Sequence, residues 1–120
     1  MEDWENDFEW LRVRHLVKDA LGRDELPDLN GILFMIGVQE LGRWDGRFTK
    51  EEKQDLLHIA VCRLLEYDEY YEFIGRDADG WPHYKELQPI DVIGLKQQGE
   101  LLRKNAIRYF KDLDSGEEEG

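Results

Sequence analysis

The sequence predicts a mainly α-helical single domain, a four-helix bundle-like fold with a short β-hairpin or structured loop between the third and fourth helices. Three observations predict it: apolar residues recur at helical spacing in four segments, Gly or Pro bounds most of them, and β-prone residues concentrate between residues 70 and 88. A length of 120 residues suits one domain. Its four Trp, five Tyr and five Phe can fill one core without a disulfide or a metal.

The first helix is expected over residues 3–21. The apolar residues Val13, Leu16, Val17, Ala20 and Leu21 recur at helical spacing and give it a face towards the core. Gly22 follows at the position where a left-handed residue often ends a helix.

The second helix is expected over residues 28–42, between Asp28 and Gly42. The apolar residues between 32 and 41 point in almost every direction around the helix axis, which is typical of a buried helix. We therefore expect this helix at the centre of the domain, with Phe34 in the core.

The third helix begins with the pattern Thr49-x-x-Glu52, which is a capping box. Apolar residues from Leu56 to Leu64 give the helix one broad core face, and the pattern allows it to continue to about residue 69.

Residues 70–88 change from helical to β-type spacing. Two β-prone runs flank the turn-like residues 76–80, which end in Asp79-Gly80. Pro82 cannot donate a ladder hydrogen bond, so its strand should lie at an edge.

The fourth helix is expected over residues 92–112, and the domain over residues 1–113. An apolar stripe runs along this helix through Leu95, Gly99, Leu102, Ala106, Tyr109 and Leu113. Residues 114–120 are acidic and are expected to form a disordered tail.

The net charge of −12 disfavours nucleic acid and anionic membranes as partners, since both require basic surfaces. Cys62 is the single cysteine, so no internal disulfide can form. The acidic N-terminal segment, Met1 to Trp4, lacks the features of a signal peptide, and the longest apolar run is too short for a membrane span. These features predict a cytoplasmic protein.

The metal-capable side chains Asp55, His58, Cys62 and Glu66 fall on one line of the third helix, but this line lies opposite its apolar face. We therefore favour a solvent-facing stripe without a metal-binding role. Asp77-Ala78-Asp79-Gly80 matches part of a calcium-binding EF-hand loop, but Gly75 would take the place of its first carboxylate. We predict no metal site and no cofactor.

Nucleophilic catalysis has few candidate residues. Ser115 lies in the acidic tail, Thr49 serves as a cap, and the acids around Cys62 should raise its thiol pKa. Glu40 could be partly buried, although it could also reach solvent or pair with Arg43 or Arg47. We assign no catalytic residue, and a non-catalytic role is favoured over an enzyme.

The first helix carries a second apolar stripe, made by Trp4, Phe8 and Leu11 together with His15. This stripe lies opposite Val13, so one core cannot easily cover both sides of the helix. The alternative is that the chain before about Trp10 folds back on its own core. The fourth helix adds an outer basic face, formed by Lys96, Arg103, Lys104, Arg108 and Lys111.

The favoured function is protein–protein contact or homo-oligomerisation through the first-helix stripe. The partner is then another protein or a second copy of the chain. The alternative is a small-ligand or metal-binding protein that uses the aromatic and acidic segment 70–84. Its candidate ligand-binding residues are Tyr71, Asp77, Asp79, Trp81 and His83.

Overall fold

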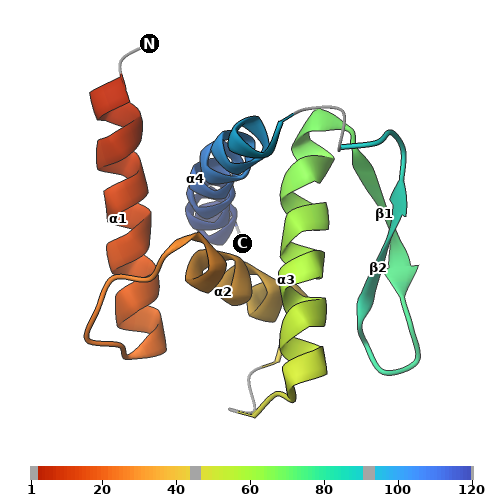
Figure 1. Ribbon diagram of the computed structural model, residues 1–120. Helices are drawn as coiled ribbons and strands as arrows, with labels where there is room; N and C mark the ends of the chain where they lie inside the picture. Colours follow the sequence, from red (N-terminus) through yellow and green to blue (C-terminus); the bar gives the residue numbers. More distant parts are fainter. Residues whose placement is uncertain (1–2, 44–46, 91–93, 120) are drawn as a thin grey trace.

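The computed structural model describes the backbone of residues 3–43, 47–90 and 94–119 and the side chains of residues 7–43, 47–90 and 94–113. In chain order the elements are α1 (Asp3–Leu21), α2 (Leu29–Leu41), α3 (Lys50–Leu65), the 3₁₀ turn η1 (Glu66–Asp68), β1 (Tyr71–Arg76), β2 (Pro82–Glu86) and α4 (Leu95–Glu119). The expected fold, four helices with a hairpin between the third and fourth, is confirmed (Figure 1). None of the helices within the described residues is both long and apolar enough to cross a membrane.

The helix ends in the central part of the chain follow local signals. Asp28 accepts a hydrogen bond from the Gly31 amide at the start of α2, and Gly42 ends α2 in the left-handed conformation. Thr49 and Glu52 form the expected capping box, with hydrogen bonds of 3.0 and 2.8 Å between each side chain and the other residue's amide.

α2 lies at the centre of the domain, as expected, and packs most closely on α3. Gly37 allows this packing, because a Cβ atom there would lie 2.3 Å from the carbonyl oxygen of Leu56. Phe34 departs from the expectation. It is only half-buried, because it packs at the edge of a small second cluster of apolar residues and not inside the main core.

The main core joins all four helices. Its members are buried and include Val13, Val17, Ile32, Leu33, Ile36, Ala60, Leu64, Ala106, Ile107 and Tyr109. Val13 and Val17 are therefore core residues, as expected, and Leu21 packs against the core, but Leu16 and Ala20 are exposed. Leu95, the first residue of the expected fourth-helix stripe, is 85% exposed at the start of α4.

The end of α3 and both ends of α4 differ from the sequence-based expectation. α3 does not continue to residue 69; it ends at Leu65, and the chain leaves through η1 and a left-handed Glu69. The side-chain amide of Asn105, which is buried, donates to Leu64 O and to Asp68 at this end. α4 begins three residues later than expected and runs beyond residue 113. The expected tail, 114–120, falls on residues whose side chains lie outside the described part.

The hairpin packs beside α3 (Figure 1). β1 and β2 are antiparallel, and a bulge between Phe73 and Gly75 interrupts their register. Arg76 ties the hairpin to the end of α2, because its guanidinium donates to Glu40 O at 2.7 Å. In a two-stranded sheet both strands are edges, which agrees with the expected position of Pro82.

Candidate functional sites

The outer face of α1 is apolar and exposed. Phe8 is 62% exposed and Leu11 43% exposed, whereas Val13 and Val17 on the opposite side are buried. His15, the next member of this stripe, is also exposed. Trp4 lies within α1, but its side chain is outside the described residues. We call Phe8, Leu11 and His15 the α1 outer stripe.

α1 stands at the edge of the molecule, so its outer side faces away from the other helices (Figure 1). The inner side is anchored at several points. Trp10 packs against the core beneath the Arg103 guanidinium, which lies 5.6 Å from the ring centroid. The Arg14 Nε donates to Pro27 O at 2.7 Å. Because these contacts fix the helix in place, the apolar stripe is held on the surface.

The expected ligand-binding segment 70–84 forms a structured hairpin turn. One carboxylate oxygen of Asp77 accepts from the amides of Asp79 and Trp81, at 2.9 and 3.0 Å. The other oxygen lies 2.9 Å from His83 Nε2. The hydrogen bond with His83, followed by those from the two amides, lowers the pKa of the Asp77 carboxyl below its ordinary value. This carboxylate therefore stabilises the turn, and Asp79 takes part through its backbone.

A cleft of about 460 Å³ opens between this hairpin and α3. It brings Asp77, Trp81 and His83 together with His58 and Cys62 of α3. Tyr71 lies outside the cleft lining, although its ring contacts that of His58 edge-on, with centroids 6.4 Å apart. Three of the five expected ligand-binding residues therefore line one cleft.

Cys62 is buried, which corrects the expected solvent-facing stripe at this residue, whereas Asp55 and His58 are exposed as expected. The hairpin covers this side of the helix, and the thiol is 1% exposed, with its Sγ 3.5 Å from His58 Nε2. Burial, followed by the charge of Glu86, raises the pKa of the thiol to about 12. The raised pKa was expected, but its main cause is burial and not the acidic neighbours. Among the side chains of residues 7–43, 47–90 and 94–113, no three His, Cys, Asp or Glu are arranged to hold a metal ion.

Glu40 is the centre of a partly buried polar cluster between α2, α3 and α4. Its carboxylate accepts a 2.6 Å hydrogen bond from the Tyr109 hydroxyl and lies 3.7 Å from Arg63 Nε. The same guanidinium lies over the rings of Tyr67 and Tyr109. The partners that the structure gives Glu40 were not predicted, because they come from helices distant in sequence. The cluster joins three helices, which is a structural role.

A larger cavity of about 810 Å³ lies between the α1–α2 connection and the N-terminal ends of α2 and α3. Its lining includes Arg23, Phe34, Phe48, Lys53 and Leu57. Sequence reasoning missed this site, since its residues come from separate segments and form no motif.

No protein-family model, curated protein or solved structure matches this chain at a significant level.

Proposed function

We propose that this chain acts through protein–protein contact, by pairing with a second copy of itself through the α1 outer stripe. The observation that carries the proposal is the exposure of Phe8, at 62%, on the side of α1 opposite the buried Val13. Large apolar side chains gathered on one exposed helix face are typical of association surfaces. The cytoplasm stays the proposed location, and the single Cys62 supports a reducing compartment.

The charges along α1 favour an antiparallel arrangement of the two copies. Acidic residues fill the first half of the helix sequence, up to Glu9. The second half carries Arg12 and Lys18, with Arg14 on the inner side and Asp19 as its one acidic residue. In a two-fold antiparallel pair, the acidic half of one α1 meets the basic half of the other. Asp7 and Lys18 lie on the same flank of the stripe, since 11 residues correspond to about three whole turns.

The energy of such a contact is modest. Each Å² of apolar surface removed from water contributes roughly 25 cal/mol, and association costs roughly 4–15 kcal/mol of lost freedom. A single pair of helices buries less than a standard interface of about 1,600 Å². We therefore expect a weak, concentration-dependent dimer.

Sedimentation velocity over a range of protein concentrations tests the proposal. The double variant Phe8→Ala/Leu11→Ala should shift the dimerisation midpoint to at least roughly tenfold higher concentration, since about 1.4 kcal/mol corresponds to tenfold. Leu16→Ala is the matched control, because Leu16 lies on the same helix, is 44% exposed and falls outside the stripe. If Leu16→Ala has the same effect as the double variant, the stripe is not the contact surface.

The cleft between α3 and the hairpin supports a second candidate function, the binding of a small molecule. Trp81 offers a ring for stacking, and His58 and His83 offer hydrogen-bonding nitrogens on the same cleft. Ligand-observed NMR with a panel of neutral aromatic heterocycles tests this function, with Trp81→Ala and His58→Ala as variants. Binding that both variants abolish supports the cleft, and binding that neither variant changes argues against it.

A further inference from the structure

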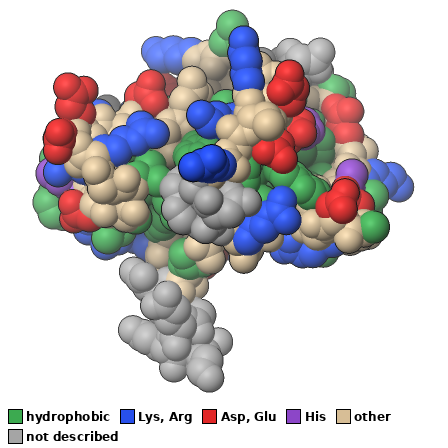
Figure 2. All heavy atoms as spheres, turned by 90° about the horizontal axis from the view of Figure 1, so that it is seen from below, with side chains coloured by type: hydrophobic (Ala, Val, Ile, Leu, Met, Phe, Trp, Pro, Cys, Tyr) green, Lys and Arg blue, Asp and Glu red, His purple; other side chains and the backbone are tan. Residues whose placement is uncertain are grey.

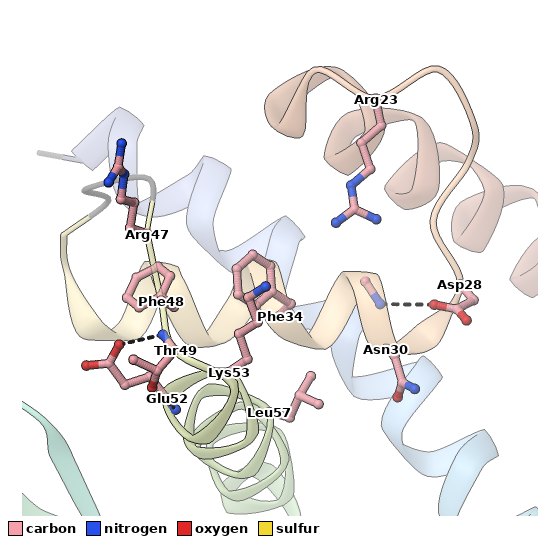
Figure 3. A pocket seen from close by; sticks show the side chains of 11 residues that line it. Arg23, Asp28, Asn30, Phe34, Arg47, Phe48, Thr49, Glu52, Lys53 and Leu57 are labelled. Atoms are coloured by element: carbon pink, nitrogen blue, oxygen red, sulfur yellow. Dashed lines mark hydrogen bonds between the residues drawn. The ribbon is translucent and has the colours of Figure 1, made fainter.

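The cavity beside the N-terminal ends of α2 and α3 has an apolar floor. Phe34, Phe48 and Leu57 are each only partly buried there, and the two phenylalanine rings pack edge-on with centroids 6.1 Å apart. Figure 3 shows these side chains between the two helices, with Arg23 reaching towards Phe34 from the connection above. A volume of about 810 Å³ is in the range of small-molecule sites.

Cationic side chains surround this floor. Arg23, Arg47 and Lys53 line the cavity, together with the carboxylates of Asp28 and Glu52. The formal charge of the lining is therefore +3 − 2 = +1, in a chain whose net charge is −12. Figure 2, which looks at the end of the molecule where α3 begins, shows hydrophobic side chains between Lys and Arg side chains near the centre of that face.

The two carboxylates in the lining already accept hydrogen bonds from backbone amides, whereas two of the three cationic side chains have no polar partner among the described residues. Asp28 accepts from the Gly31 amide, and Glu52 accepts from the Thr49 amide, so both serve as helix caps. Within residues 7–43, 47–90 and 94–113, the side chains of Arg23 and Lys53 form no ion pair or hydrogen bond. An anion in the cavity could therefore pair with both without breaking an existing contact.

We propose that this cavity binds a small monocarboxylate with an aromatic or short alkyl body. The apolar body packs on Phe34, Phe48 and Leu57, and the carboxylate pairs with the Arg23 guanidinium and the Lys53 ammonium. The lining charge of +1 matches a monoanion, because Asp28 and Glu52 repel a phosphate dianion more strongly than a monocarboxylate. The proposal places the anion on these two side chains and not on the helix N-termini, where Asp28 and Thr49 accept from the Gly31 and Glu52 amides.

Titration with 3-phenylpropanoate, followed by backbone-amide NMR of the full chain, tests the proposal. The neutral 3-phenylpropanamide has the same body and is the matched ligand control. We expect the carboxylate to shift the amides of residues 28–34 and 48–57 and to bind about tenfold more tightly than the amide, as one charge-assisted contact predicts. Equal binding of the two ligands, or shifts elsewhere on the molecule, would overturn the proposal.

Single substitutions distinguish a direct contact with Arg23 or Lys53 from an effect of the net charge of the surface. Arg23→Ala and Lys53→Ala should each weaken 3-phenylpropanoate about five- to tenfold and leave the neutral amide unchanged. Lys50→Ala removes a cation from the same helix at a position that does not line the cavity, and it should leave both ligands unchanged. If Lys50→Ala weakens binding as much as Lys53→Ala, the effect is one of net charge and the proposed site is wrong.

The result of this test does not depend on the proposed pairing of α1. The double variant Phe8→Ala/Leu11→Ala should bind 3-phenylpropanoate as the wild type does, because neither residue lines the cavity. Loss of binding in that variant would contradict the site at α2 and α3.

Discussion

The hydroxyl of Tyr109 donates a 2.6 Å hydrogen bond to the Glu40 carboxylate and so joins α4 to α2. The Tyr109 side chain is 1% exposed, and Glu40 also lies 3.7 Å from the Arg63 guanidinium. One carboxylate thus has contacts to two other helices, α3 and α4. This contact fixes how α4 lies across the central helix.

The change Tyr109→Phe should lower the free energy of unfolding by about 1.5–3 kcal/mol, the usual contribution of a hydrogen bond to a charged group. Tyr67→Phe is the matched control, because the Tyr67 hydroxyl donates to Asp112 at 3.2 Å in an exposed setting. Its loss should cost less than about 1 kcal/mol. Urea denaturation of both variants measures the difference, and equal losses would contradict the special role of Tyr109.

Stability should fall in alkaline solution. Burial, followed by the hydrogen bond and charge of Glu40, raises the pKa of Tyr109 above its ordinary value of 10.0. The phenol therefore stays neutral in the folded chain, while it ionises in the unfolded chain above pH 10. Its contribution is complete below pH 10, and above it the free energy of unfolding should fall by about 1.4 kcal/mol per pH unit.

Urea denaturation between pH 8 and 11 measures this loss. Burial also raises the pKa values of Tyr84 and Cys62. The free energy of unfolding of the wild type should therefore fall more steeply with pH than the titration of Tyr109 alone would cause. The free energy of unfolding of the Tyr109→Phe variant should fall less steeply with pH than that of the wild type. A free energy of unfolding that stays constant up to pH 11 would contradict the burial of these groups.

The close packing of α2 on α3 depends on Gly37. Gly37→Ala places a methyl group 2.3 Å from Leu56 O, which is backbone and cannot rotate away, so we expect a loss of about 3 kcal/mol. Gly99→Ala is the contrasting change, because a Cβ at this helical position meets nothing within 4 Å. It should stabilise the chain by about 0.5–1 kcal/mol. Thermal denaturation compares the two, and a wild-type midpoint for Gly37→Ala would rule out the close approach.

The thiol of Cys62 should react slowly. Its exposure is 1% and its pKa is about 12, so little thiolate is present or accessible near neutral pH. Alkylation by iodoacetamide at pH 7.5 should be more than about tenfold slower in the folded chain than in the same chain unfolded in urea. Equal rates would show that the hairpin does not cover this side of α3.

Local signals explain which parts of the fold the sequence could predict. The capping pair Thr49 and Glu52, the cap Asp28 and the end residue Gly42 each act within four residues, so their patterns identify the ends of α2 and α3. The apolar period of α1 identified Val13 and Val17. The same period also suggested Leu16 and Ala20, which are exposed, because a pattern alone does not show which positions the neighbouring helices cover.

The sites depend on contacts between distant segments, which one sequence does not reveal. The hydrogen bond between Glu40 and Tyr109 joins residues that are 69 positions apart in the sequence. Cys62 is buried because the hairpin folds over α3. The cavity around Arg23 and Lys53 forms only when the α1–α2 connection meets α2 and α3. The exposed Phe8 and Leu11 are the exception, since their spacing already placed them opposite the core face.

The pairing of α1 with a second copy is the central claim, and a charge exchange tests it most directly. The proposed antiparallel pair places Asp7 of one copy near Lys18 of the other, so Asp7→Lys and Lys18→Glu should each create two repulsive contacts. In a mixture of the two variants, every such contact becomes attractive again.

Sedimentation equilibrium at moderate salt over the micromolar range should be run on the wild type, each variant and their equimolar mixture. The proposed pairing predicts a wild-type dimer, weaker association of each variant alone and dimers restored in the mixture. A wild type that stays monomeric throughout this range, or a mixture as weak as its components, would contradict the proposed pairing.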